Sequence, residues 1–402
     1  MNNLWTVYNY EIKKIVNRKS FWITSFICAI CIAFTTCSGL VGTYYVDGKP
    51  IESNYEAAIK DQAYRKELSG RVIDNSLIQE TVEAYSHVPT DVYRYTLTEE
   101  YEMFARPYSD IFNLIRTWTG MNIVDLKEHK LDENILYEAR MKRLEKEWQS
   151  IPLIEIEKEY WREKETSINK PFVYYYHEGY EIMLNAFLTV GIVMLLFVAI
   201  CLSNLFADEH IRRTDQLVLS CIAGKKQAYW AKILAGVTVS VVAAIMMAIL
   251  TIGLCLVIYG TEGFDMPLQS CTSMYSYPIS IGEACLIAYG VLIIASILAA
   301  VFVMVISEIF QSGIIALAIS ACLIILGNMI IIPSQYRIIA QIWGFSPMAY
   351  LSTWNLFDPR TIVLFNQCIP SWQIVPLIYI LLSVVLAFLG SNIYKKYQVS
   401  GR

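Results

Sequence analysis

The chain has 402 residues, of which 55% are hydrophobic and only 17% are charged. Soluble domains carry charge on about a quarter of their residues, so this composition argues against a soluble protein and favours a membrane protein. The net charge of −4 is unevenly spread, because residues 43–181 hold 18 basic and 27 acidic side chains and the rest of the chain is basic. No nucleic-acid partner is expected from this balance.

Residues 1–19 predict an amphipathic helix that lies on the cytoplasmic membrane surface. Apolar residues recur at helical spacing from Leu4 to Ile15, and Lys13, Lys14 and Arg18 lie beside them. A helix of this kind can rest in the headgroup plane. An ordinary basic flank of the first membrane helix is the alternative interpretation.

Six uncharged runs are long enough to cross a bilayer, which takes about 20 apolar residues. They lie within residues 20–43, 182–207, 233–261, 284–307, 309–336 and 361–394. The first run is too long for the apolar part of a signal peptide and no A-x-A cleavage site follows it, so residues 20–42 are interpreted as a retained transmembrane helix. The predicted fold class is an all-α polytopic membrane protein with six transmembrane helices.

The distribution of basic residues predicts the orientation of these helices. Twelve Lys and Arg residues flank the runs on the side of the two termini, whereas the short loops on the other side carry only Arg337 and Arg360. Because positive residues favour the cytoplasmic side, both termini are expected in the cytoplasm. The acidic insert, residues 43–181, is then extracellular, and residues 182–402 hold transmembrane helices 2 to 6.

The insert is expected to be mainly helical. One apolar seam has alternating spacings of four and three residues and is formed by Tyr137, Met141, Leu144, Trp148 and Ile151. Such spacing places one stripe of apolar side chains along a helix, and Pro152 ends it. A weaker seam starts with Tyr55, Ile59 and Ala63. The two seams predict a helical hairpin, and residues 85–125 show no clear pattern.

No catalytic, metal or cofactor site is expected in this chain. The sequence has no HExxH and no G-x-S-x-G, and "AGKKQ" lacks the glycine and the Ser or Thr of a Walker A motif. The uncharged runs also lack the buried acids or histidines that ion-driven carriers use for coupling. Any uphill transport would therefore need energy from a partner. Cys271 and Cys368 fall in predicted extracellular loops, and their pairing stays open.

The loop 208–230, within "NLFADEHIRRTDQLVLSCIAGKKQAYWAKIL", concentrates charge between two apolar runs. From Ile211 onward, apolar residues recur at the spacing of a short amphipathic helix, with charged residues on the other face. This pattern predicts a helix along the cytoplasmic membrane surface that shows a polar face to the cytosol. A simple positive anchor is the alternative interpretation.

This loop resembles the first cytoplasmic loop of permeases of the ABC-type-2 family, also called type V exporters. In that family a Glu, a later Thr and a Leu-rich run form a coupling helix that docks into the ATPase. The residues at these positions, with the intervening arginines, are Glu209, Arg212, Arg213, Thr214, Leu217 and Val218. Arg213 stands where the family has glycine. The N-terminal helix is similar to the family's elbow helix, and the basic cluster Lys225, Lys226 and Lys232 matches as well.

Residues 333–372 are too polar to cross a membrane and are rich in aromatic residues. "WGFSPMAYLSTWNLF" resembles the family's Ser-Pro-aromatic segment ahead of the last helix, which implies a re-entrant extracellular gate. The expected gate residues are Trp343, Phe345, Pro347, Tyr350 and Trp354. An interfacial aromatic belt would have a similar composition.

The resemblance implies a permease subunit in the plasma membrane that pairs with a second permease, identical or related, and with two copies of a cytosolic ABC ATPase. ATP and Mg²⁺ would bind to the ATPase chains and not to this one. The apolar runs suit an amphipathic or antimicrobial peptide or a hydrophobic molecule as the exported substrate. A sodium-extruding permease, and a membrane-anchored sensor or adaptor without transport, stay open as alternatives.

Overall fold

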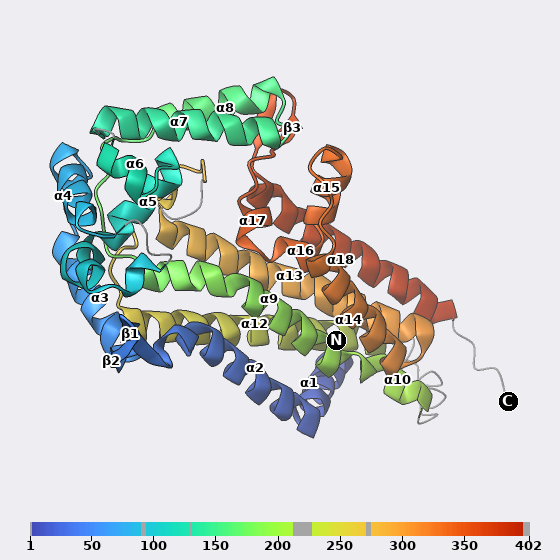
Figure 1. The fold of residues 1–402 in the computed structure, drawn as a ribbon. Coiled ribbons are helices and arrows are strands. Elements are labelled where there is room, and N and C mark those ends of the chain that lie inside the picture. Colours follow the sequence, from blue (N-terminus) through green and yellow to red (C-terminus); the bar gives the residue numbers. More distant parts are fainter. Residues whose placement is uncertain (1, 90–93, 129–130, 212–226, 271–274, 397–402) are drawn as a thin grey trace.

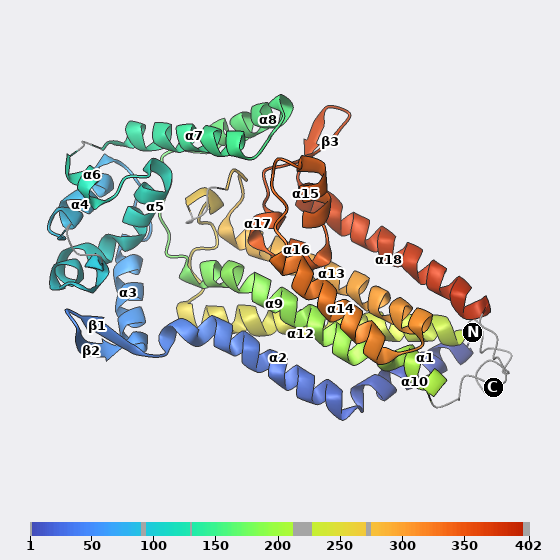
Figure 2. The ribbon, with the colours of Figure 1, turned by 45° about the vertical axis from the view of Figure 1, so that its right-hand side comes forward.

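The computed structural model of this chain describes residues 2–89, 94–128, 131–211, 227–270 and 275–396. These residues are mostly helical, with two small β-hairpins. A bundle of long helices makes up one part of the molecule, and the insert packs at one end of it (Figure 1). Helix α1 (Asn2–Val16) and the end of α18 (Ser371–Lys396) lie at the opposite end (Figure 2). We call the two ends the insert end and the terminal end.

Among the described residues, five helices are long and apolar enough to cross a membrane, which supports a mostly helical, multi-pass membrane protein. These candidate spans are Lys19–Leu40, Glu178–Ile211, Tyr229–Tyr259, Ile281–Phe310 and Ser371–Lys396. They contain α2 (Lys19–Cys37), α9 (Glu178–Leu202) with α10 (Asn204–Ile211), α12 (Tyr229–Tyr259), α13 (Ile281–Phe310) and α18.

The predicted fifth crossing is shorter than expected. Helix α14 (Gly313–Met329) has 17 residues, roughly 25 Å at 1.5 Å per residue, against a hydrocarbon core about 30 Å thick. The apolar run continues to Ile332, but the helix stops before it, because the residue ahead of Pro333 disfavours helical backbone. Among the described residues, five of the six predicted spans are therefore long helices, and the fifth predicted crossing is a shorter one.

Helices α9 and α13 form the centre of the bundle. In the most apolar stretch of each of these spans 67% of the residues are buried, against 22% in the span that contains α2. Helix α13 contacts α9, α12, α14 and α18. At the periphery, α2 packs against α9 and α12, and α1 packs against α12. The exposed apolar faces of α2, α12 and α18 are what a helix bundle presents to lipid.

In its described residues the insert has one hairpin, six α-helices and three short helical turns of other types, at Tyr95–Leu97, Tyr101–Ala105 and Arg106–Tyr108. Strands β1 (Thr43–Val46) and β2 (Lys49–Ser53) are antiparallel. The helices are α3 (Asn54–Leu68), α4 (Asn75–Ser86), α5 (Ser109–Thr119), α6 (Ile123–Glu128), α7 (Glu133–Ser150) and α8 (Glu155–Thr166). The expectation of a mainly helical insert agrees with this arrangement, and α5 lies in the region that the sequence left unassigned.

The first predicted seam of the insert is confirmed and the second is wrong. On α7, Leu144 and Trp148 are buried, and the other seam residues pack against the same core. On α3, however, Tyr55 is 54% and Ile59 48% exposed, whereas Ala57 and Leu68 are buried. Helical spacing on α3 was predicted correctly, but the core lies against a different face.

Residues 333–372 form short elements between α14 and α18. They include α15 (Arg337–Gly344), α16 (Pro347–Tyr350) and α17 (Thr353–Leu356). An antiparallel hairpin of β3 (Ile362–Leu364) and β4 (Gln367–Ile369) follows. Figures 1 and 2 place β3 next to α8, whereas α16 and α17 lie against α9 of the bundle.

Gly263, in the loop after α12, is a position that only glycine should tolerate. Its φ of +89° lies in the left-handed region, and a Cβ there would overlap the carbonyl oxygen of Tyr176. We expect Gly263→Ala to lower the free energy of unfolding by roughly 3 kcal/mol or more. Gly48 has a φ of +75° but open space around it, so Gly48→Ala should cost only about 1 kcal/mol. Thermal unfolding of both purified variants would separate the overlap of the new Cβ with Tyr176 from the strain of the left-handed backbone. Equal losses of stability in the two variants would contradict the role of the Tyr176 contact.

Candidate functional site

At the terminal end, a charged cluster joins α1, α10 and α12. The Lys232 ammonium lies 2.5 Å from a carboxylate oxygen of Glu209, and the Lys14 ammonium lies 3.8 Å from the other oxygen. Lys14 also pairs with Glu11 of its own helix at 3.5 Å. We call these four residues the basal cluster. It connects the start of α12 to the end of α10, where the predicted loop 208–230 begins.

The basal cluster is largely buried, which makes its pairing energetically important. The side chain of Lys232 is 1% exposed and that of Glu209 13%. The Lys232 ammonium also lies 4.8 Å from the centre of the Phe206 ring and 3.5 Å from the Leu205 carbonyl oxygen. A buried charge that loses its partner costs several kcal/mol, so these elements should move together.

Two further ion pairs surround this cluster. The Arg18 guanidinium lies 2.8 Å from the Asp208 carboxylate and joins the start of α2 to α10. The His210 imidazole lies 3.3 Å from the buried Glu308 carboxylate near the end of α13. Ion pairs thereby connect α10 to α1, α2 and α12, and the contact of His210 with Glu308 connects it to α13.

Of the predicted ATPase-coupling residues, the structure describes only Glu209. Its carboxylate is paired within the chain, which the sequence pattern did not reveal, so it is not presented as a free docking charge. The other predicted coupling residues, Arg212, Arg213, Thr214, Leu217 and Val218, lie outside the described residues.

At the insert end, two of the five predicted gate residues, Phe345 and Tyr350, contact Tyr379 of α18, and Pro347 lies between these two in the chain. The Tyr379 hydroxyl donates a 2.7 Å hydrogen bond to the Phe345 carbonyl. The Tyr350 ring packs edge-on against Phe345 and Tyr379, with 6.1 Å between ring centres in each pair. Pro347 starts α16, the helix that carries Tyr350. This aromatic cluster fixes the short helices onto α18.

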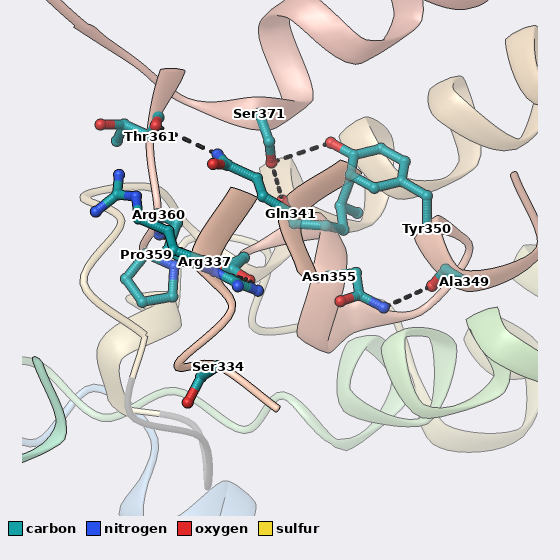
Figure 3. Close-up of polar contacts among 12 residues, drawn as sticks. Ser334, Arg337, Gln341, Ala349, Tyr350, Asn355, Pro359, Arg360, Thr361 and Ser371 are labelled. Atoms are coloured by element: carbon teal, nitrogen blue, oxygen red, sulfur yellow. Dashed lines mark hydrogen bonds and ion pairs between the residues drawn. The ribbon is translucent and has the colours of Figure 1, made fainter. Parts of the chain in front are cut away.

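Hydrogen bonds add to this packing. Tyr350 is fully buried, and its hydroxyl donates to the Ser371 hydroxyl at 3.1 Å, as Figure 3 shows. Burial raises the pKa of Tyr350, so it stays neutral. In the same view, the Gln341 amide of α15 donates to the Thr361 carbonyl at 3.3 Å.

The other two predicted gate residues lie outside the aromatic cluster. The Trp343 indole donates to the Ile330 carbonyl at 3.1 Å, next to the end of α14. Trp354 of α17 is 71% exposed. The sequence identified the aromatic segment but did not distinguish its buried members from its exposed ones.

A buried carboxylate links the insert to residues 333–372. Glu157 of α8 is fully buried, and one of its oxygens accepts from the Arg337 guanidinium at 2.8 Å. The same oxygen accepts from the backbone N–H of Thr361 at 2.7 Å and from its hydroxyl at 3.1 Å. The other oxygen accepts from the Ile154 N–H at 3.0 Å. The buried Glu157 carboxylate thereby accepts four hydrogen bonds at this contact.

Three contacts reinforce this link. The buried Trp161 indole donates to the Pro359 carbonyl at 2.7 Å. The Arg337 guanidinium also donates to the Pro152 carbonyl at 2.8 Å. The thiol of Cys368, one partner in the open disulfide question, lies 3.6 Å from the Ile156 carbonyl, and Cys271 is outside the described residues. We call Glu157, Trp161, Arg337 and Thr361 the insert latch.

Arg360 and Asp358 stiffen the chain next to the latch. The Arg360 Nε lies 2.9 Å from each oxygen of the Asp358 carboxylate. Burial alone would lower the pKa of Arg360, but the hydrogen-bonded carboxylate raises it above its ordinary value. The Asp358 carbonyl accepts from the hydroxyl of Tyr277, whose pKa is raised by complete burial. The loop before α13 therefore belongs to the same contact.

The latch was not visible in the sequence. Its ion pair joins residues 180 positions apart, and neither residue belongs to a recognisable motif. The predicted positive-inside pattern marked Arg337 and Arg360 only as exceptions on the far side. In the structure Arg337 pairs with Glu157 and Arg360 pairs with Asp358. These acids offset the positive charges that the positive-inside rule disfavours on the predicted extracellular side.

Comparison with known proteins adds no identification. No protein-family model matches the chain, and a search of curated proteins finds no significant match. The resemblance to ABC-type-2 permeases therefore depends on the motifs and on the multi-pass helical fold alone.

Proposed function

We propose that this chain is the membrane-spanning permease subunit of an ATP-driven exporter of the ABC-type-2 kind. In this proposal both termini are cytoplasmic, α14 completes a set of six membrane helices, and two copies of an ATPase bind below two permease chains. The observation that supports it best is the basal cluster. Buried charges there join α10, which leads into the loop 208–230, to the elbow helix α1 and to α12.

The basal cluster suggests how the motion of an ATPase would reach the bundle. A force on the loop 208–230 would act on α10, and the Glu209 pair would pass it to Lys232 of α12. Separating the pair would leave two poorly solvated charges. A joint shift of both helices therefore costs less free energy than a movement of α10 alone. Arg212 and Arg213 keep the proposed docking role, whereas Glu209 acts by holding α10 in place.

Residues 333–372 would then form the outer gate. The aromatic cluster ties α16 to α18, and the insert latch ties α15 and β3 to α8. Opening toward the outside would have to move these elements relative to α13 or carry the insert with them. This arrangement supports a role for the insert in gate movement.

The proposed substrate is an amphipathic or antimicrobial peptide or another hydrophobic molecule. An apolar groove of about 490 Å³ runs along α2 and α12, with the end of α1 closing part of it. Its lining includes Trp22, Cys28, Val242 and Met246. Such a lining favours apolar groups over ions, and the net negative charge of the insert favours cationic peptides outside.

Neutralising one of the paired charges tests the role of the basal cluster. With the partner ATPase present, we expect Glu209→Gln to lower transport at least tenfold while ATP hydrolysis continues, because an unpaired Lys232 loosens α10 from α12. Lys13, an exposed residue of α1, provides the control, and Lys13→Gln should leave transport unchanged. Transport and ATP hydrolysis would be measured together in proteoliposomes. Full transport by Glu209→Gln would contradict this role.

A membrane-anchored sensor is the second candidate, and the insert latch favours it. The latch connects a large insert to the segment that precedes α18, so a ligand on the insert could act on the bundle without any transport. The two functions differ in partner, because only the exporter requires a bound ATPase.

A further inference from the structure

A cleft of about 580 Å³ separates the insert from residues 354–359, at the insert end of the molecule. Helices α5 and α7 form one wall, and α17 with the following turn forms the other. Its polar and aromatic lining includes Arg116, Arg143, Glu147, Trp148, Trp354 and Asp358. Pockets of 300–1,000 Å³ typically hold drug-sized ligands. Neither the permease nor the sensor proposal assigns a role to this cleft.

The charge that stays available in the cleft is positive, although the insert as a whole is acidic. Asp358 is already occupied, because its two oxygens pair with Arg360. Arg143 and Glu147 lie 3.9 Å apart, at the outer limit of an ion pair, and both side chains are about 40% exposed. Arg116 donates to the Asn113 amide oxygen at 3.2 Å, a neutral partner. Two arginines therefore line the cleft, together with one loosely paired acid.

The cleft also offers an apolar surface beside these arginines. Trp354 is 71% exposed, while Trp148 and Phe357 are each 2% exposed and close the base. An aromatic side chain buries 150–250 Å² when it is covered, so an exposed tryptophan in a cleft gains from an apolar ligand group. Ile151, at the end of α7, adds to the same surface.

We propose that this cleft binds a small amphipathic anion, and that the free carboxylate end of a peptide with a C-terminal aromatic residue is the class that fits. Arg116 and Arg143 bind the carboxylate, since guanidinium groups donate paired hydrogen bonds to it. Trp354 and Ile151 cover the aromatic side chain. The inference does not rest on transport, because a sensor would use the same cleft.

The position of the cleft gives ligand binding a structural consequence. Residues 354–359 form one wall and continue directly into Arg360 and Thr361, and Pro359 accepts the hydrogen bond from Trp161 of the latch. A ligand that touches both walls therefore bridges the insert and residues 333–372 next to the latch. Binding should reduce the relative motion of these two parts.

The test uses the full chain in nanodiscs of a neutral phospholipid and two forms of one probe. The probe is acetyl-Gly-Gly-Phe with a free carboxylate, and its C-terminal amide is the matched control ligand. Isothermal titration calorimetry should show saturable binding of the acid, with the amide at least tenfold weaker. Arg116→Gln with Arg143→Gln, and separately Trp354→Ala, should each weaken binding of the acid at least tenfold.

Lys142→Gln serves as the matched protein control, since Lys142 is 80% exposed on α7 beside Arg143. Its binding should equal that of the unchanged protein. Because Trp354 is exposed, Trp354→Ala should not affect folding, so a loss of binding there is not a loss of structure. Failure of the acid to bind, equal binding of acid and amide, or unaffected binding by both sets of variants would overturn the proposal. None of these results would bear on whether an ATPase binds.

Discussion

Replacing Arg140 with methionine is expected to destabilise the insert by about 3–5 kcal/mol. Arg140 is fully buried, and its guanidinium pairs with the two oxygens of the buried Glu165 at 2.9 and 3.1 Å. It also donates to the Tyr275 carbonyl at 3.0 Å and lies 4.9 Å from the centre of the Trp118 ring. Without Arg140, Glu165 keeps only Lys170, at 3.3 Å. A buried carboxylate with one partly exposed cation is poorly compensated.

The measurement is the apparent unfolding temperature of the full-length protein in mild detergent, followed by tryptophan fluorescence. Arg140→Met with Glu165→Met should recover much of the loss, because replacing a whole buried pair with apolar residues is often neutral. Lys142→Met removes an exposed pair with Glu138 and should change little. An unfolding temperature of Arg140→Met equal to that of the control would contradict the structural role of this pair.

Replacing Glu157 with alanine is expected to open the insert latch. The carboxylate is fully buried and satisfies Arg337, the Thr361 backbone and hydroxyl, and the Ile154 N–H. Removing it leaves the Arg337 guanidinium with the Pro152 carbonyl but no charged partner, and the N–H groups of Thr361 and Ile154 lose their acceptor, at a cost of about 3 kcal/mol or more. Because the insert and residues 333–372 meet at this carboxylate, the loss should appear as local opening.

Trypsin gives a direct readout, since Arg337 and Arg360 are cleavage sites that the unchanged protein keeps paired. Cleavage after these residues should rise at least tenfold in Glu157→Ala, with a smaller rise in Glu157→Gln, which keeps one acceptor. Glu155 lies on the same helix, is 74% exposed and pairs only with Lys158, so Glu155→Ala is the matched control. Equal cleavage in the Glu157 and Glu155 variants would exclude the latch.

The sequence predicted the features that depend on local pattern. The apolar runs gave five long membrane helices near their expected bounds, and the seam from Tyr137 to Ile151 gave α7 and its buried face. These succeeded because the length of an apolar run and its helical spacing act within one element. The same reasoning failed for α3, since Tyr55 and Ile59 share a face that stays about half exposed.

Features that join distant elements could not be predicted. Arg140 and Glu165 stand among many charges of the insert, and nothing local marks them as the buried pair. Glu209 lies in the stretch that resembles a coupling helix, yet its partner Lys232 lies beyond the loop that follows, at the start of α12. The sequence places such charges on a helix face, whereas the packing of other helices decides whether that face is solvated.

The end of α14 shows a third kind of limit. Uncharged residues continue past Met329, so hydropathy alone extends the helix. Pro333 and the polar residues after it instead start the segment that carries the aromatic cluster. A count of apolar residues predicts which segments can lie in a membrane. It does not predict the end of the helix, which proline sets through its missing N–H and its effect on the preceding residue.

The most direct test of the exporter proposal is purification of the tagged chain from its native cell in a gentle detergent or in nanodiscs, with mass spectrometry of the bound proteins. We predict a near-stoichiometric partner that carries the GxxxxGK[ST] nucleotide-binding motif. The variant Arg212→Ala with Arg213→Ala should lose this partner, while Glu209→Gln should keep it. A chain that purifies without any such partner, under conditions that preserve other membrane complexes of the same cell, would contradict the exporter proposal and leave the sensor.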